Sequence, residues 1–274
     1  MFEKCFEYIF LGLIQGLTEF IPISSTAHLK IVPILFGFPD PGVSISAFLQ
    51  LGSIFAVVFY FKKEINLVLI NLIGKTISNK KNDLDYKNLG LKIILGTIPI
   101  LLIGFIFKIY WSDYTDSFLR SSHSIGIVSI LMACLMYFSI KFSNQKKNLL
   151  ELDFSNSFLV GLSQSLALIP GVSRSGITLS SILLCGLRKE EAAKFSFLLG
   201  IPSITIAGIA EFSSLMISNT QIDLFPLFLG FISSAIFSLL SIDLFIKFLK
   251  YNGLGPFIFY RLVFGTFLLL SNSF

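Results

Sequence analysis

Apolar segments long enough to cross a lipid bilayer recur along this chain, and they limit its fold more than any other feature. A helix needs about 20 mostly apolar residues to cross a hydrocarbon core of about 30 Å. A shorter apolar segment, 64–77, carries polar residues and is expected to lie in the membrane interface. With some tilt allowed, the predicted spans are about 44–61, 89–110, 124–141, 195–217, 224–249 and 254–273. The pattern predicts an all-α polytopic membrane protein.

The composition favours a single membrane domain that covers residues 1–274. Hydrophobic residues make up 54% of the chain and charged residues 14%, whereas soluble domains carry roughly a quarter charged residues. The three cysteines lie far apart, so neither a disulfide framework nor a metal-binding spacing is visible. No signal peptide is expected, because the N-terminus lacks a basic region and a cleavage site. The net charge of +5 lies in short loops, which fits anionic membrane lipids better than nucleic acid.

Two further apolar regions are interrupted by helix breakers. Residues 6–38 are broken at Pro22 and Pro33, with a cluster of polar residues between the two prolines. Residues 154–187 are broken at Pro170 and Gly171, with a polar cluster after the break. Non-helical backbone persists at membrane depth only where it is buried in protein or faces a wet cavity. Each region is therefore predicted to form a re-entrant hairpin of two half-helices.

The two interrupted regions resemble each other in sequence. Residues 12–28 align without gaps with residues 161–177 and are identical at five of 17 positions, and a serine follows the break in both. We therefore expect two repeats, about 6–141 and about 154–273, each with one re-entrant hairpin and three transmembrane helices.

The loop charges predict how these repeats are oriented. The positive-inside rule places lysine-rich loops in the cytoplasm. By that rule the cytoplasmic loops are 62–92, 141–153, 188–194 and 247–252, and the outer loops are 39–44, 111–123 and 218–223, where Arg120 is the one basic residue. Both termini then lie outside, and the two halves have inverted topology. In such architectures binding sites form near the bilayer midplane from broken helices.

Polar residues at the start of each second half-helix predict an anion site. Ser24 and Ser173 are suited to cap these helices, and a helix N-terminus presents free N–H groups to an anion. Arg174 adds a planar fork suited to phosphate oxygens. The residues expected around the substrate are Ser24, Thr26, Gly171, Ser173, Ser175 and Thr178.

Glu19 is the acidic residue of the same region. A carboxylate at this depth is costly unless it binds a cation or acts as a base. Gln15 lies four residues earlier on the same helix face, so Glu19 and Gln15 are the expected ligands of a divalent cation. A diphosphate together with such a cation would satisfy the charged groups of the site.

Structural roles for the same residues stay open. Glu19 and Arg174 could form a purely structural ion pair, and the serines and Gln15 could serve helix packing. Arg261 could extend to the membrane surface or contact substrate. His123, in a loop, is assigned no role.

Two long motifs resemble those of the undecaprenyl-diphosphate phosphatase family of the bacitracin-resistance type. The first is QGLTEFIPISSTAH at 15–28, and the second is PGVSRSGIT at 170–178. The similarity extends to LQLGSIFAVV, AAKFSFLLGIP and FIFYRLV, at 49–58, 192–202 and 257–263, and so covers nearly the whole chain.

The resemblance implies an enzyme, a phosphoric anhydride hydrolase. It would convert undecaprenyl diphosphate to undecaprenyl phosphate and inorganic phosphate at the outer face of the bacterial inner membrane, recycle the lipid carrier for peptidoglycan, and confer bacitracin resistance. It would use Mg²⁺ or Ca²⁺. By the same resemblance Glu19 is the essential acid, Ser25 the nucleophile or a substrate ligand, His28 its acid–base partner, and Arg174 the residue that holds the diphosphate.

Gln15 departs from the pattern, because many family members have a second glutamate there, and Ser46 and Lys194 depart as well. The inverted repeat also suits a lipid-phosphate flippase or a small-anion transporter. Such a carrier needs Arg174 but no carboxylate facing the anion, so Glu19 and His28 favour the enzyme. The sequence leaves open whether Ser25 or water attacks, which cation binds, the preferred chain length, and the oligomeric state, a homodimer included.

Overall fold

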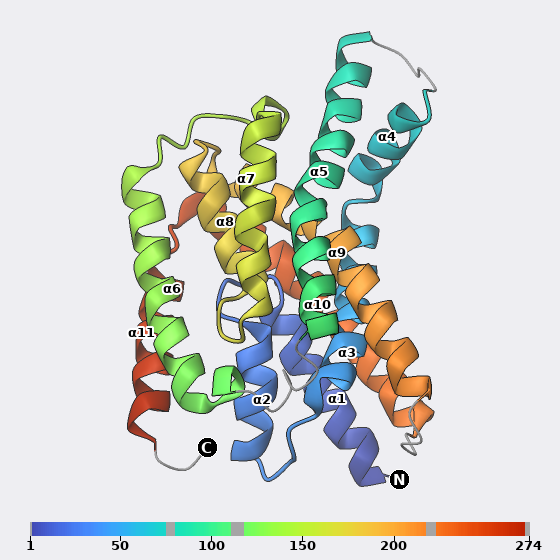
Figure 1. The fold of residues 1–274 in the computed structure, drawn as a ribbon, viewed down its shortest axis with the longest axis vertical. Coiled ribbons are helices and arrows are strands. Elements are labelled where there is room, and N and C mark those ends of the chain that lie inside the picture. The colour runs from blue at the N-terminus through green and yellow to red at the C-terminus, as the bar shows by residue number, and fades with distance from the viewer. Residues whose placement is uncertain (1, 75–79, 111–117, 218–222, 272–274) are drawn as a thin grey trace.

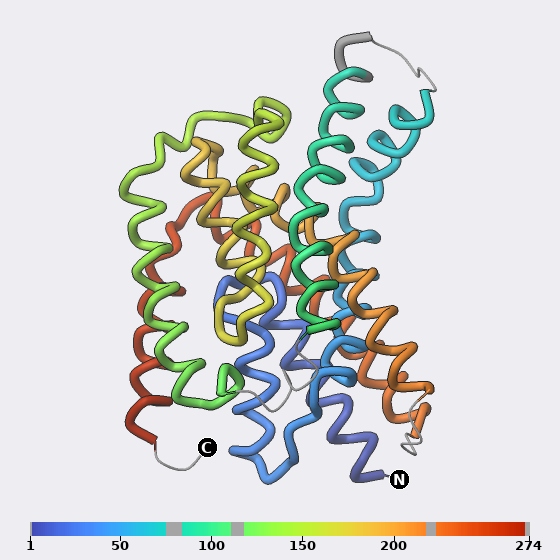
Figure 2. The backbone as a smooth tube through the Cα atoms, in the orientation of Figure 1, coloured from blue at the N-terminus to red at the C-terminus, as the bar shows by residue number. Residues whose placement is uncertain are grey.

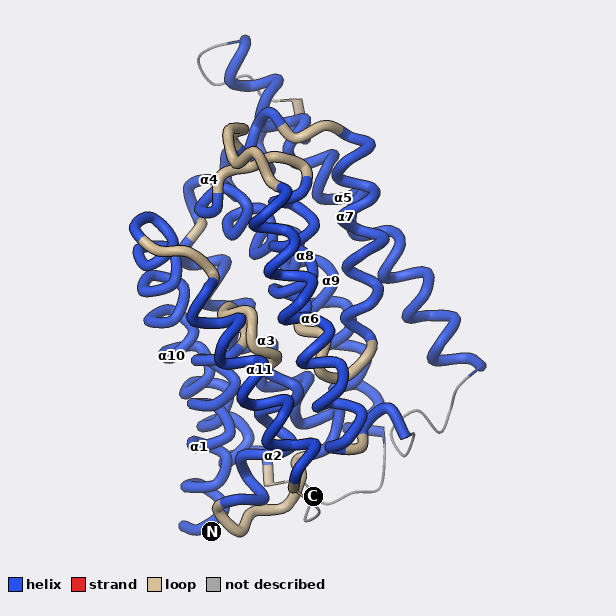
Figure 3. Tube along the Cα trace, turned by 90° about the vertical axis from the view of Figure 1, so that its left-hand side faces the viewer, coloured by secondary structure: helices blue, strands red, loops and turns tan. Residues whose placement is uncertain are grey.

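The computed structural model describes residues 2–74, 80–110, 118–217 and 223–271, which form a bundle of helices (Figure 1). Figure 3 shows helices and loops, without a β-strand, in the described part of the chain. The α-helices are α1 (Phe2–Thr18), α2 (Ser25–Leu35), α3 (Gly42–Tyr60), α4 (Lys62–Leu72), α5 (Lys80–Tyr110), α6 (Ser122–Phe142), α7 (Phe154–Gln164), α8 (Arg174–Leu184), α9 (Lys189–Ile217), α10 (Leu224–Tyr251) and α11 (Gly255–Leu270). Short 3-10 helices are η2 (Phe118–Arg120), η3 (Leu149–Glu151) and η4 (Ser165–Leu168).

In the described part of the chain five helices are long and apolar enough to cross a membrane, and they coincide with five of the six predicted spans. They are α3, α5 from Leu84 to Tyr110, α6, α9 and α10. The sixth predicted span, 254–273, forms α11, whose 16 residues extend only about 24 Å. The prediction of a polytopic all-α membrane protein is therefore confirmed.

Both interrupted regions form pairs of short helices joined by a turn. α1 ends at Thr18 and α2 begins at Ser25, while α7 continues into η4 and α8 begins at Arg174. The two turns lie side by side halfway along the bundle (Figure 2), where the Ser175 hydroxyl donates to the carbonyl of Ile21 at 3.3 Å. α1 begins and α11 ends at one end of the bundle, opposite the loop after α6 (Figures 1 and 3).

Glycines let the first helix of each pair approach a long helix closely. A Cβ on Gly12 of α1 would collide with the carbonyl of Gly230 on α10, and a Cβ on Gly161 of α7 would collide with that of Gly96 on α5. Such contacts between small residues are the usual means of packing helices in membranes. Serine hydroxyls reinforce both contacts, from Ser233 to the carbonyl of Ile9 at 2.8 Å and from Ser157 to that of Lys92 at 2.7 Å.

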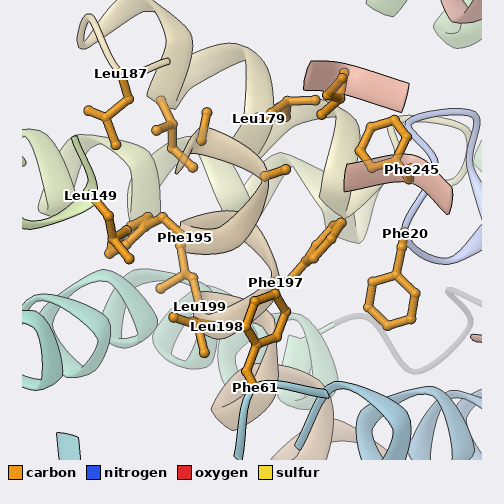
Figure 4. Close-up of a cluster of buried hydrophobic side chains, with 14 of the residues drawn as sticks. Phe20, Phe61, Leu149, Leu179, Leu187, Phe195, Phe197, Leu198, Leu199 and Phe245 are labelled. Atoms are coloured by element: carbon orange, nitrogen blue, oxygen red, sulfur yellow. The ribbon is translucent and has the colours of Figure 1, made fainter. Parts of the chain in front are cut away.

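An aromatic cluster anchors the turn after α1. Phe20 is fully buried and packs edge to face on Phe197 of α9, with ring centroids 4.9 Å apart. Figure 4 shows Phe61 and Phe245 in the same apolar cluster. Because Phe20 directly follows Glu19, its burial holds that carboxylate in the bundle interior.

The segment predicted to lie in the interface forms α4, and its residues 75–77 lie outside the described part of the chain. Val68 and Leu72 of α4 lie against Gly90 of α5, where a Cβ would come within 2.8 Å of each side chain. α4 therefore packs along α5 through its apolar face.

Candidate active site

Ser24 and Ser173 cap α2 and α8 in the same uncommon backbone conformation. Their φ angles are 75° and 70°, in the left-handed region that non-glycine residues rarely adopt. The Ser24 hydroxyl accepts a hydrogen bond from the Ala27 amide at 3.4 Å, and the Ser173 hydroxyl accepts one from the Gly176 amide at 3.1 Å. The predicted N-caps are thus confirmed, and backbone strain of this kind is concentrated at functional sites.

An ion pair between Arg174 and Glu19 joins the two helix pairs. The Arg174 Nη2 lies 3.1 Å from the Glu19 Oε1, and its Nη1 donates to the carbonyl of Ser196 at 2.8 Å. The Arg174 Nε is buried and has no hydrogen-bond partner among the described residues. A structural ion pair therefore exists, and Nε is a buried donor without an acceptor among the described residues.

The Glu19 carboxylate is the centre of this polar network. Its Oε2 accepts hydrogen bonds from the Gln15 amide at 2.8 Å and from the Ser25 hydroxyl at 2.7 Å. Glu19 is only 5% exposed, so Arg174, Gln15 and Ser25 replace the water that would otherwise solvate it. The structure thus brings together four of the predicted site residues, from α1 and the turn that follows it, α2 and α8.

His28 lies in the same half-helix as Ser25 but has other partners. Its Nδ1 lies 2.7 Å from the carbonyl oxygen of Ser24, and its Nε2 lies 2.6 Å from the hydroxyl of Tyr260 on α11. The ring also stacks on Phe264, with centroids 4.8 Å apart. The Ser25 hydroxyl therefore pairs with the Glu19 carboxylate in this structure, whereas the sequence resemblance implied a partnership with His28.

The other predicted substrate residues surround the start of α8. The hydroxyls of Ser173 and Ser175 lie 3.1 Å apart. The Thr178 hydroxyl donates to the carbonyl of Arg174 at 2.7 Å and lies 2.5 Å from the Ser196 hydroxyl. Thr178 therefore supports the first turn of α8 from within, while half-buried Thr26 lies in the first turn of α2.

Arg261 is a buried residue of the site region whose role the sequence left open. It is fully buried, so it does not extend to the membrane surface, which was one of the two alternatives that the sequence left open. Its Nη1 donates to the carbonyl of Pro22 at 3.0 Å, and its Nη2 donates to the carbonyls of Gly171 and Val172. Arg261 thus ties both helix breaks together. An arginine inside an apolar span was the signal for such a role.

Gly200 was not singled out from the sequence. A Cβ at this position of α9 would overlap the Arg174 guanidinium, 2.5 Å from its Cζ. Only the lack of a side chain at Gly200 leaves room for the guanidinium, and a glycine within a long apolar helix gives no sign of such a partner.

The donors around Glu19 suit a hard divalent cation in part. The Gln15 Oε1 is buried without a hydrogen-bond partner in the described structure, beside the Glu19 carboxylate, and oxygen donors are what Mg²⁺ and Ca²⁺ take. No group of three or more His, Cys, Asp or Glu side chains gathers among the described residues. Substrate and water would have to complete the coordination, so the divalent cation stays a prediction.

Comparison with known proteins assigns the chain to a family. A family model described as Bacitracin resistance protein BacA matches residues 8–267. The chain belongs to the BacA family. An undecaprenyl-diphosphatase of Prochlorococcus marinus is 46% identical over 269 residues, 98% of this chain and 93% of the relative. One from Synechococcus is 45% identical over 269 residues, 98% of this chain and 94% of the relative.

The family assignment confirms the resemblance found in the motifs. In this BacA-family chain the motif residues Glu19, Ser25 and Arg174 form one connected polar network, and His28 lies beside it, bonded to Tyr260.

Proposed function

We propose that this chain hydrolyses undecaprenyl diphosphate to undecaprenyl phosphate and inorganic phosphate. The reaction recycles the lipid carrier for peptidoglycan synthesis and confers bacitracin resistance. Membership of the BacA family and the name of its relatives support the substrate. The single observation that carries the chemistry is the chain of contacts Ser25–Glu19–Arg174, built where the N-termini of α2 and α8 converge.

The diphosphate binds at these two N-termini. Free N–H groups and the positive ends of the helix dipoles stabilise an anion there. The unpartnered Nε of Arg174 donates to a phosphate oxygen, and the hydroxyls of Ser173 and Ser175 offer further donors. Phosphoryl transfer depends mainly on positioning and on charge stabilisation, and this arrangement provides both.

Glu19 is the proton acceptor that the geometry favours. If Ser25 attacks, its Oγ forms a bond to phosphorus, the bridging P–O bond breaks, undecaprenyl phosphate leaves, and the hydroxyl proton passes to Glu19, 2.7 Å away. Water then hydrolyses the phosphoserine to release inorganic phosphate. If water attacks directly, Glu19 takes its proton and Ser25 positions the phosphate.

Mg²⁺ or Ca²⁺ is the proposed cofactor, held by Glu19 and by the Oε1 of Gln15. A divalent cation stabilises the negative charge of phosphoryl oxygens during transfer. Glu19 and Gln15 supply only part of its coordination, so this site works only once substrate is bound.

The proposed architecture is an inverted repeat, about 6–141 and about 154–273, in the bacterial inner membrane, with each short helix pair re-entrant and the site open to the outer face. The matching caps at Ser24 and Ser173 and the matching contacts of Gly12 and Gly161 support it. Single cysteines at Asp40 and Lys146, in a chain without its native cysteines, test the topology. Labelling from outside is expected at position 40 alone, and equal labelling of both positions would refute the proposal.

Phosphate release by purified protein from a polyprenyl diphosphate, with and without chelator, tests the function. Release that a chelator stops is the expected result. A flippase or small-anion transporter would instead move its substrate across vesicle membranes without releasing phosphate, and would do so with Glu19 replaced by glutamine.

A further inference from the structure

The hydrogen bonds of His28 determine which nitrogen of its ring carries the proton. The carbonyl oxygen of Ser24 can only accept a hydrogen bond, so the Nδ1 that lies 2.7 Å from it must be the protonated nitrogen. A neutral ring with hydrogen on Nδ1 has a lone pair on Nε2. The Tyr260 hydroxyl, 2.6 Å from Nε2, is therefore the donor of that bond. Both nitrogens are occupied, and neither reaches the Ser25 hydroxyl, which donates to Glu19.

Tyr260 connects this buried ring to the outside of the bundle. His28 is 4% exposed, whereas Tyr260 is 40% exposed. The two rings stack at 5.6 Å, and Phe264 stacks on both of them. The imidazole is thus packed against aromatic rings. Of its two hydrogen-bond partners, the Tyr260 hydroxyl belongs to the side chain that is accessible from outside the bundle.

The surroundings contain few other groups that could control the charge of His28. From α11 these are Tyr260 and Arg261. Burial above all, and to a lesser extent the cation of Arg261, disfavours a positive charge on the ring, whereas the hydrogen bond to the Ser24 carbonyl favours it. Lys30, on α2 itself, donates to the carbonyl of Arg120, and Glu19 is engaged by Ser25.

We propose that Tyr260 is a positioning residue that sets the tautomer and the protonation of His28 for the phosphatase reaction. The inference rests on the proposed function, in which the diphosphate binds at the N-terminus of α2 that Ser24 caps. The Nδ1–H of the neutral His28 donates to the Ser24 carbonyl at 2.7 Å and so supports this cap. The Tyr260 hydroxyl keeps Nε2 free of hydrogen, and both side chains stay neutral through the reaction.

Tyr260→Phe tests the proposal, because it keeps the stacked ring and removes only the hydroxyl. A donor to Nε2 stabilises the neutral ring, so its loss makes protonation of His28 easier. The pH profile of kcat/KM is expected to move to higher pH by roughly one unit, the equivalent of one hydrogen bond. At neutral pH the ring stays neutral, and kcat/KM is expected to fall by about 10-fold or less, the equivalent of one lost hydrogen bond. Tyr137→Phe, on an exposed side chain of α6, is the matched control and should leave the profile unchanged.

Nitrogen-15 NMR of histidine-labelled protein gives a readout that does not need turnover. The chain has only two histidines, so His123→Gln assigns the signals. The native protein should show His28 with hydrogen on Nδ1, and Tyr260→Phe should raise the pH at which the ring becomes imidazolium. An unchanged titration and an unchanged pH profile in Tyr260→Phe would overturn the inference. If the native protein released no phosphate from a polyprenyl diphosphate, the proposed function would fail, while the NMR titration would still decide what Tyr260 does to His28.

Discussion

Gly200 and Arg174 are in direct contact, and no side chain fits between the backbone of α9 and the guanidinium that pairs with Glu19. The guanidinium is the flexible end of a long side chain, so a methyl group on residue 200 would push it aside at little cost in stability. The same displacement would shift the guanidinium relative to the proposed phosphate position, while the long side chain can still reach the Glu19 carboxylate.

Gly200→Ala should therefore lower activity much more than stability. A displacement of about 1 Å at a reacting group costs about 100-fold in rate, and kcat/KM for phosphate release is expected to fall by that factor. The thermal unfolding midpoint in detergent should change little. Gly104→Ala is the matched control, because a Cβ there would meet a single atom, of Leu168, at 3.8 Å. Equal activities of the two variants would contradict the placement of Arg174.

Arg174→Lys should abolish most activity although the positive charge is kept. An ammonium group cannot bind Glu19, the Ser196 carbonyl and a phosphate oxygen together, because it lacks the planar fork. Loss of one such donor costs about 10²–10³-fold in kcat. Arg188→Lys, at an exposed pair with Asn148, should keep normal turnover. Near-normal turnover of Arg174→Lys would leave Arg174 only a structural role.

Glu19→Gln should stop hydrolysis while the lipid still binds. The amide can neither accept the Ser25 proton nor ligate a cation as an anion, so turnover should fall by at least about 10³-fold. Lipid binding should survive because Arg174 and both helix N-termini remain. Phosphate release and equilibrium binding of polyprenyl diphosphate measure the two effects. If Glu19→Gln still released phosphate and a chelator did not stop it, the carboxylate would be neither the proton acceptor nor a ligand of the cation.

Arg261→Met should destabilise the protein and reduce its activity together. It leaves the carbonyls of Pro22, Gly171 and Val172 buried without their donor, and each lost partner costs about 1–3 kcal/mol. Arg261→Lys keeps the charge but reaches fewer carbonyls, so its thermal unfolding midpoint and kcat/KM should both be intermediate. If Arg261→Met unfolded at the native temperature and had native kinetics, the hydrogen bonds from Arg261 to the two helix breaks would not be needed for stability or activity.

The course of the chain through the membrane follows from its sequence, because each feature depends on neighbouring residues. Apolar runs of about 20 residues predict spans wherever they occur, and five were found as predicted. Proline at 22 and 170 ends helices locally, and Ser24 and Ser173 cap the helices that follow, as expected from their positions after the breaks.

The partners of the site residues were decided by tertiary structure. The first motif contains Glu19, Ser25 and His28 but does not show which residues they contact. The rotation of α1, α2 and α11 about their axes determines that Ser25 faces Glu19 and that His28 faces Tyr260. Tyr260 lies 232 residues from His28 in the sequence. Arg261 reaches the break at Pro22 across 239 residues of chain. Hydropathy and capping signals act over a few residues, whereas these contacts depend on the relative placement of helices that only packing of the whole bundle fixes.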